Sequence, residues 1–238
     1  IAIKIAQRYI KEVYYRRNGR DYFGVGMENN SKGWEVKSTK KSKNYNKDSD
    51  GVLMSKEGDY SPTIIFQNGM NAFKYYKKEN GTEAKKTFLN QLAWLKTNFR
   101  VYDNTYGLWK FTKEKKAYSL NEDWPSALSQ GMGIGLALMG YYETGDEELL
   151  EIVRKAVLAY KVPVKQGGFM RCWDKGLWYE EYPTEKPSRV LNGFIFSLAG
   201  LYNVYENTGD KLALALFQEG IKTLKDKLHL YDVNFISK

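Results

Sequence analysis

The sequence predicts a mainly α-helical protein: an incomplete (α/α) toroid of helical hairpins, preceded by a short irregular or β-containing N-terminal segment. Three observations predict this fold: a long internal repeat, a glycine turn inside each repeat, and apolar residues at helical spacing around each turn. The repeat glycines Gly69, Gly131 and Gly193 follow one another at intervals of 62 residues. A long, regular period is typical of hairpin units that bury their apolar faces only against neighbouring units.

A second set of glycines, Gly81, Gly145 and Gly209, marks a turn within each repeat. Glycine ends a helix at low cost because it adopts the left-handed conformation, and the adjacent Thr or Asp can cap the next helix. Apolar residues at helical spacing follow each turn: Phe88, Leu89, Leu92 and Leu95; then Leu149, Leu150, Val153, Ala156, Val157 and Tyr160; then Leu212, Leu216, Leu224 and Leu228.

The segments between hairpins are long and carry Trp and Gly, as at residues 106–109 and 167–170. We interpret them as loops or short hairpins gathered at one end of the helices, where they would form one site. Residues 59–238 are therefore predicted to form the toroid, and residues 1–58 a separate arm. Within the arm, residues 1–15 suggest a helix, whereas residues 22–54 fit either a strand-containing fragment or a loop-rich arm.

Composition limits the classes of function. The net charge of +9, from 37 Lys and Arg against 28 Asp and Glu, favours a polyanionic partner. No basic run is followed by a nucleic-acid motif, so the charge does not select DNA or RNA, and no nucleic-acid partner is expected. Aromatic residues make up 15% of the chain, which suits either a sugar site or an aromatic core. No apolar run is long enough to span a membrane, and the compartment stays open.

The chain contains one cysteine and one histidine, which limits the catalytic and metal-binding chemistry available to it. Cys172 is the only cysteine, so an internal disulfide is impossible, and His229 is the only histidine. A multi-histidine metal site is thereby excluded, and a Ser-His-Asp triad is disfavoured. We expect neither a metal nor a cofactor, and proton chemistry must use Tyr, Glu, Asp, Lys or Arg.

Four blocks of sequence resemble the glucuronyl C5-epimerases. The most specific is Trp-Tyr-Glu-Glu-Tyr-Pro at 178–183 followed by Val-Leu-Asn-Gly-Phe at 190–194. Supporting blocks are Tyr-Ser-Pro…Gln-Asn-Gly at 60–69, Trp-Pro-Ser-Ala-Leu-Ser-Gln-Gly at 124–131, and Leu-Tyr-Asp at 230–232. The resemblance covers about residues 51–232. It implies an incomplete α/α barrel that follows a β-rich region and converts D-glucuronate to L-iduronate in heparosan-type polymers.

Two departures from the family pattern accompany this resemblance. Only some 50 residues are present for the β-rich region before residue 51. The family also continues after its Leu-Tyr-Asp block, with a tyrosine-and-arginine segment and a Tyr-His segment that supply further active-site groups.

The resemblance assigns the proton chemistry to Tyr182, with Glu181 as an acid or as the group that orients it. Removal of a hydrogen α to a carboxylate needs a base, an acid on the opposite face, and a cation beside the carboxylate. A tyrosinate base would need cationic neighbours because the reference pKa of Tyr is about 10. Arg171 or Arg189 could neutralise the uronate, or either could be a salt bridge that fixes a loop.

Further substrate contacts are expected from amides and aromatic rings. The amides stand one or two residues before the repeat glycines and either bind sugar hydroxyls or tie loops to helices: Gln67, Gln130 and Asn192. The rings are either sugar platforms or core residues: Trp124, Trp178, Tyr60 and Tyr231.

Two other functions stay open. A polysaccharide lyase or uronyl hydrolase on the same toroid shares much of this chemistry, and a non-catalytic polyanion-binding domain needs none of it. A homodimer is also possible. The sequence does not select the polymer or its sulfation.

Overall fold

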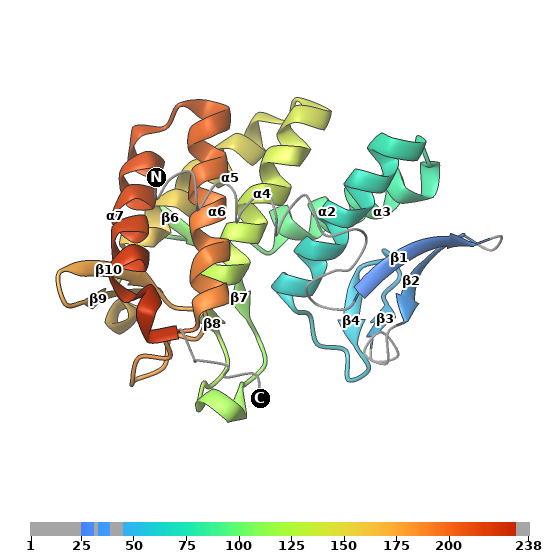
Figure 1. Ribbon diagram of the computed structural model, residues 1–238. Helices are drawn as coiled ribbons and strands as arrows, with labels where there is room; N and C mark the ends of the chain where they lie inside the picture. The colour runs from blue at the N-terminus through green and yellow to red at the C-terminus, as the bar shows by residue number, and fades with distance from the viewer. Residues whose placement is uncertain (1–24, 31–32, 39–44, 232–238) are drawn as a thin grey trace, which may run out of the picture.

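The computed structural model describes residues 25–30, 33–38 and 45–231, and this part of the chain is mainly helical (Figure 1). The helix expected over residues 1–15 lies outside the described residues. Six α-helices are present in the described part: α2 (Pro62–Glu79), α3 (Thr82–Thr97), α4 (Ala127–Thr144), α5 (Glu147–Leu158), α6 (Leu191–Thr208) and α7 (Lys211–Lys227).

The six helices form three hairpins packed in series. The first helices of the hairpins are neighbours, α2 against α4 and α4 against α6, and each also packs on its own second helix, α3, α5 or α7. Figure 1 shows this progression from α2 and α3 on one side to α6 and α7 on the other. The three predicted helix–turn–helix units are thus confirmed, with the repeat glycines in the first helix of each.

The turns within the hairpins follow the glycine prediction in two units of three. Gly145 and Gly209 end their helices with φ of +71°. In the first unit the left-handed residue is Asn80, with φ of +51°, and Gly81 has an ordinary φ of −75°. The expectation for Gly81 was therefore wrong: Asn also tolerates this conformation, because its short polar side chain bonds locally.

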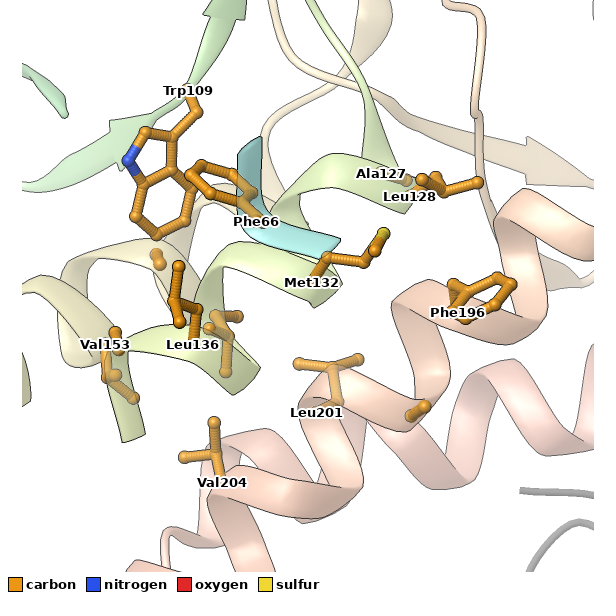
Figure 2. Close-up of a cluster of buried hydrophobic side chains, with 14 of the residues drawn as sticks. Phe66, Trp109, Ala127, Leu128, Met132, Leu136, Val153, Phe196, Leu201 and Val204 are labelled. Carbon is orange, nitrogen blue, oxygen red and sulfur yellow. The ribbon is translucent and has the colours of Figure 1, made fainter. Parts of the chain in front are cut away.

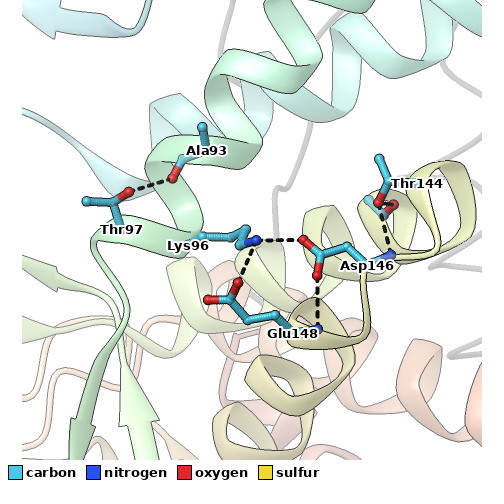
Figure 3. Close-up of polar contacts among 7 residues, drawn as sticks. Ala93, Lys96, Thr97, Thr144, Asp146 and Glu148 are labelled. Atoms are coloured by element: carbon cyan, nitrogen blue, oxygen red, sulfur yellow. Dashed lines mark hydrogen bonds and ion pairs between the residues drawn. The ribbon is translucent and has the colours of Figure 1, made fainter.

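Helix capping also distinguishes the first hairpin from the other two. Asp146 accepts a hydrogen bond from the Glu148 N–H, and Asp210 accepts one from the Ala213 N–H. Thr82 is instead the first residue of α3, which begins without a side-chain cap. Lys96 on α3 adds a link between the first two units through ion pairs of 2.6 Å to Asp146 and Glu148 (Figure 3).

Helices α4 and α6 cross at glycines. A Cβ on Gly131 would lie 2.4 Å from the Phe196 carbonyl oxygen, and one on Gly200 would lie 2.5 Å from the Gly131 Cα. A Cβ on Gly133 would lie 2.6 Å from the Trp109 ring. Close packing therefore requires glycine at 131 and 133, whereas a Cβ at Gly135 would make only an ordinary contact with Met70. Figure 2 shows the apolar cluster beside it, with Phe196 and Leu201 of α6 facing α4.

In the described part of the chain, the strands pair into five two-stranded antiparallel hairpins. Two precede α2, so the described part of the 22–54 region is strand-containing rather than wholly loop. The pairs are β1 (Val25–Asn30) with β2 (Gly33–Ser38), β3 (Tyr45–Lys47) with β4 (Leu53–Ser55), β5 (Arg100–Tyr102) with β6 (Tyr106–Leu108), β7 (Lys110–Phe111) with β8 (Trp124–Pro125), and β9 (Met170–Trp173) with β10 (Gly176–Tyr179).

The two long connections between units thus contain three of these hairpins. Residues 98–126 hold β5 to β8, and residues 159–190 hold β9 and β10. Short 3-10 helices complete the described structure: η3 (Lys116–Tyr118), η4 (Ala159–Lys161), η5 (Val164–Gln166) and η6 (Leu228–Tyr231). None of the helices described has the combination of length and apolar content that a bilayer crossing requires.

Candidate functional site

The two long connections meet at Tyr182. Its ring stacks on that of Tyr118 at 3.8 Å between centroids and 16° between planes, and Trp124 lies 5.8 Å away. Trp124 in turn stacks on Phe111 at 4.1 Å. The Ala127 N–H donates to the Glu180 carbonyl at 3.0 Å, which joins the start of α4 to the same segment. Residues some 60 positions apart are thereby brought into one aromatic cluster.

Tyr182 and Glu181 form the titratable pair of this cluster. Tyr182 is half-buried, whereas the Glu181 carboxyl is buried and its Oε2 atom makes no hydrogen bond. Burial raises the pKa of Glu181, although the Tyr182 hydroxyl and Lys115 act in the opposite direction. Burial, followed by the charge and hydrogen bond of Glu181, raises the pKa of Tyr182 well above its ordinary value. Tyr182 is therefore a neutral phenol at neutral pH.

The neighbouring carboxylate, Glu180, is fully buried; its Oε2 is hydrogen-bonded, whereas its Oε1 is held only by an ion pair. Its Oε2 accepts from the Ser188 hydroxyl at 2.7 Å and from the Arg189 N–H at 2.9 Å, and its Oε1 lies 3.4 Å from Arg171 Nε. Arg171 also donates to the Thr184 carbonyl. These contacts fix the loop that follows Tyr182. Of the two roles considered for Arg171, they agree with a salt bridge that fixes a loop.

Arg189 is held on the far side of this loop. Its backbone is left-handed, with φ of +49°, and its guanidinium lies 3.9 Å above the Trp173 ring. The Tyr231 hydroxyl donates to the Arg189 carbonyl at 2.6 Å. Burial, and then the charge of Glu180, raises the pKa of Tyr231 to about 12. Arg189, Tyr231 and Arg171 are thus grouped around Glu180 rather than around Tyr182.

The three predicted amides occupy different environments. Gln130 is fully buried, and its Nε2 donates to the Gly107 carbonyl at 2.8 Å and the Ala156 carbonyl at 3.2 Å, which ties two connections to α4. Gln67 is also buried, but its Oε1 atom has no hydrogen-bond partner. Asn192 is half-buried in the first turn of α6. Gln130 therefore ties loops to a helix, the structural alternative for this amide.

The aromatic residues predicted to bind sugar also lie in different parts of the structure. Trp124 joins the cluster and donates from Nε1 to the Lys113 carbonyl at 2.9 Å. Trp178 belongs to the core, with 1% of its surface exposed and its ring stacked 3.8 Å from Phe194. Tyr60 lies on the first hairpin's side, where its hydroxyl donates to Asp48 Oδ2 at 2.7 Å.

Two neighbours of Tyr182 itself were missed by sequence reasoning: Tyr118, and Lys115, whose Nζ lies 6.0 Å from the Tyr182 ring centroid. Both belong to the β7–β8 loop, and no motif marks them. As for metals, the described ranges contain no grouping of three or more His, Cys, Asp or Glu side chains that could hold an ion.

Comparison with known proteins agrees with the motif-based recognition. A family model described as D-glucuronyl C5-epimerase C-terminus matches residues 103–238, and a domain family of unknown function matches residues 1–46. The chain belongs to the D-glucuronyl C5-epimerase family, and the resemblance predicted from the sequence is confirmed. The family is named for an epimerase, which is a kind of isomerase.

Two relatives show how much of the family's length is represented. An uncharacterised protein of Methanocaldococcus jannaschii, MJ1128, is 35% identical over 132 residues, which cover 54% of this chain and 43% of that protein. The D-glucuronyl C5-epimerase of Caenorhabditis elegans is 30% identical over 205 residues, covering 79% of this chain and 32% of that protein. The chain therefore spans less than half the length of either relative.

Proposed function

We propose that this protein epimerises D-glucuronate to L-iduronate residues within a heparosan-type acidic polysaccharide. Membership of the epimerase family supports the reaction. The observation that carries the proposal is the position of the Tyr182 ring, stacked on Tyr118 and next to the buried Glu181, at the meeting point of the two long connections. Half-burial leaves Tyr182 accessible to a polymer at the surface.

The reaction breaks the C5–H bond on one face of the sugar and forms a new C5–H bond on the other. The electron pair left at C5 is delocalised into the adjacent carboxylate until the new proton arrives. The raised pKa of Tyr182 keeps its phenol protonated at neutral pH, so it can serve as the donor that delivers a proton to C5. The donation leaves a tyrosinate, and Glu181 in its protonated form, which its raised pKa favours, can return a proton to it.

The group that removes the proton from the opposite face is expected from the tyrosine-containing segment that the family carries after its Leu-Tyr-Asp block. We also propose that the three hairpins are part of an incomplete (α/α) toroid over residues 59–238, with residues 1–58 as a separate arm. The serial packing of α2, α4 and α6 supports this arrangement.

The test is hydrogen exchange at C5. The full-length protein is incubated with heparosan in deuterated water, and the polymer is then examined by NMR for deuterium at C5 and for iduronate. We expect both signals. Polymer bound without exchange would leave only a polyanion-binding domain, and formation of an unsaturated uronate would instead identify a lyase.

A further inference from the structure

The proposed reaction needs a cation beside the uronate carboxylate, and neither predicted arginine is available near Tyr182. Arg171 is paired with the buried Glu180 and donates to the Thr184 carbonyl. Arg189 lies over Trp173, with its backbone N–H bound to Glu180. Moving the Arg171 side chain would orphan the Glu180 carboxylate, which is costly for a buried charge. Moving the Arg189 guanidinium would break its stacking on Trp173.

The β7–β8 loop presents the alternative. Its lysines form a series in which three have a carboxylate partner: Lys110 with Asp123 at 2.8 Å, Lys113 with Asp59 at 2.5 Å, and Lys116 with Glu114 at 3.1 Å. Lys115 makes no ion pair of 4 Å or less with any residue that the structure describes. Its side chain is exposed, and its Nζ lies 6.0 Å from the Tyr182 ring centroid.

The backbone of Lys115 is nevertheless fixed. Its N–H donates to the Leu120 carbonyl at 2.8 Å, and its own carbonyl accepts from Tyr118 at 2.9 Å and from Leu120 at 3.3 Å. These bonds close the loop, so that Lys115 and the Tyr118 ring are presented to Tyr182 together. A fixed backbone with an unpaired ammonium group is a binding arrangement that costs little reorganisation when an anion arrives.

We propose that Lys115 binds the carboxylate of the uronate whose C5 faces Tyr182, and that it stabilises the charge that develops there during proton transfer. The inference rests on the proposed function and names the residue that supplies its missing cation. A flexible ammonium on a four-carbon stem can reach past the Tyr182 ring to an anion beside it.

The test compares three variants by binding and by exchange. The probes are a heparosan hexasaccharide and the same hexasaccharide with its carboxylates reduced to alcohols. Lys115→Gln removes the cation, Lys115→Arg retains a charge, and Lys116→Gln is the matched control because it removes an adjacent exposed charge. The measured quantities are Kd for each probe by calorimetry and the rate of C5 deuterium exchange.

We expect the wild-type protein to prefer the native hexasaccharide, and Lys115→Gln to reduce that preference about tenfold, the effect of one charge-assisted hydrogen bond. Lys116→Gln should change it less than about twofold, and Lys115→Arg should keep most of it. Equal effects of the two glutamine variants would overturn the assignment. If the wild-type protein shows no exchange, the epimerase proposal fails, while the carboxylate preference still decides the role of Lys115.

Discussion

Two adjacent glutamates divide the site region into halves of opposite character. On the Glu180 side, a fully buried carboxylate accepts from Ser188 and the Arg189 backbone through Oε2 and forms an ion pair with Arg171. On the Glu181 side, a buried carboxyl has no ion-pair partner among the described residues and lies beside a half-buried tyrosine. The first half holds a loop in place, whereas the second places a carboxyl without an ion pair next to a phenol. The predictions below test this division.

The largest expected effect is on the Glu181 side. Tyr182→Phe removes the proton donor while keeping the ring that stacks on Tyr118, so C5 exchange should fall by about 10²- to 10⁴-fold with little change in stability. Tyr179→Phe is the control, because its buried hydroxyl donates to the Leu216 carbonyl; it should lose about 1 kcal/mol of stability but keep its activity. Comparable exchange rates for the wild-type and Tyr182→Phe proteins would refute the assignment.

On the Glu180 side the expected loss is in stability. Glu180→Gln leaves the Arg171 guanidinium without its carboxylate and should lower the free energy of unfolding by about 3–5 kcal/mol. Urea denaturation followed by circular dichroism measures the change. A stability close to that of the wild type would mean that this carboxylate does not hold the loop.

The same substitution one residue later should act in the opposite direction. Glu181→Gln removes a buried charge with an unpartnered oxygen, so stability should rise by about 1 kcal/mol, or about 2–4 °C in Tm, while C5 exchange slows. Calorimetry of the two single variants side by side gives the sign of each. If Glu180→Gln and Glu181→Gln both lowered stability, the proposed difference between the two glutamates would be wrong.

The pH dependence sharpens this point. Because the folded-state pKa of Glu181 is raised, the folded protein holds that proton more tightly than the unfolded chain. Its stabilising contribution is fully present below the ordinary glutamate pKa, about 4.3, and is lost as pH rises through the folded-state value. The stability advantage of Glu181→Gln should therefore grow from pH 4 to pH 7, as measured by urea titrations. An advantage independent of pH would show that the charge is not its cause.

The smallest effect concerns the aromatic cover. Tyr118→Ala removes the ring stacked on Tyr182, an interaction of about 0.5–1.5 kcal/mol, so kcat/KM should fall by about two- to tenfold. Tyr118→Phe should retain most of the activity if the ring alone matters. Steady-state kinetics on heparosan would separate the two variants, and an equal loss in both would point to the hydroxyl instead.

Local signals predicted the helices better than they predicted the site. The glycine turns, the apolar spacing and the amide-glycine repeats lie within one hairpin each, so sequence periodicity was sufficient for them. Asn80 took the role expected of Gly81 because two residue types fit one backbone conformation. Only the specific Glu-Glu-Tyr-Pro block led to Tyr182.

The partners of Tyr182 could not be predicted in the same way. Tyr118 and Lys115 reach it across the gap between two connections, and only tertiary packing places them there. The arginines illustrate the converse: their residue type suited the uronate, but the neighbouring Glu180 pairs with Arg171 and holds the Arg189 backbone. The two arginines close to Tyr182 in sequence are thus engaged within the fold, whereas Lys115, distant in sequence, has no ion-pair partner among the described residues.

The glycine crossing of α4 and α6 has a consequence for engineering. Since peptide backbones, not side chains, meet at Gly131 and Gly200, the separation of these two helices is already at its minimum and cannot shrink when nearby residues are trimmed. Cavities cut elsewhere in the core should therefore leave the spacing between Ala127 and Leu191, the first residues of the two helices, almost unchanged. The candidate site, which lies near these first residues, should therefore keep its geometry when the core is altered.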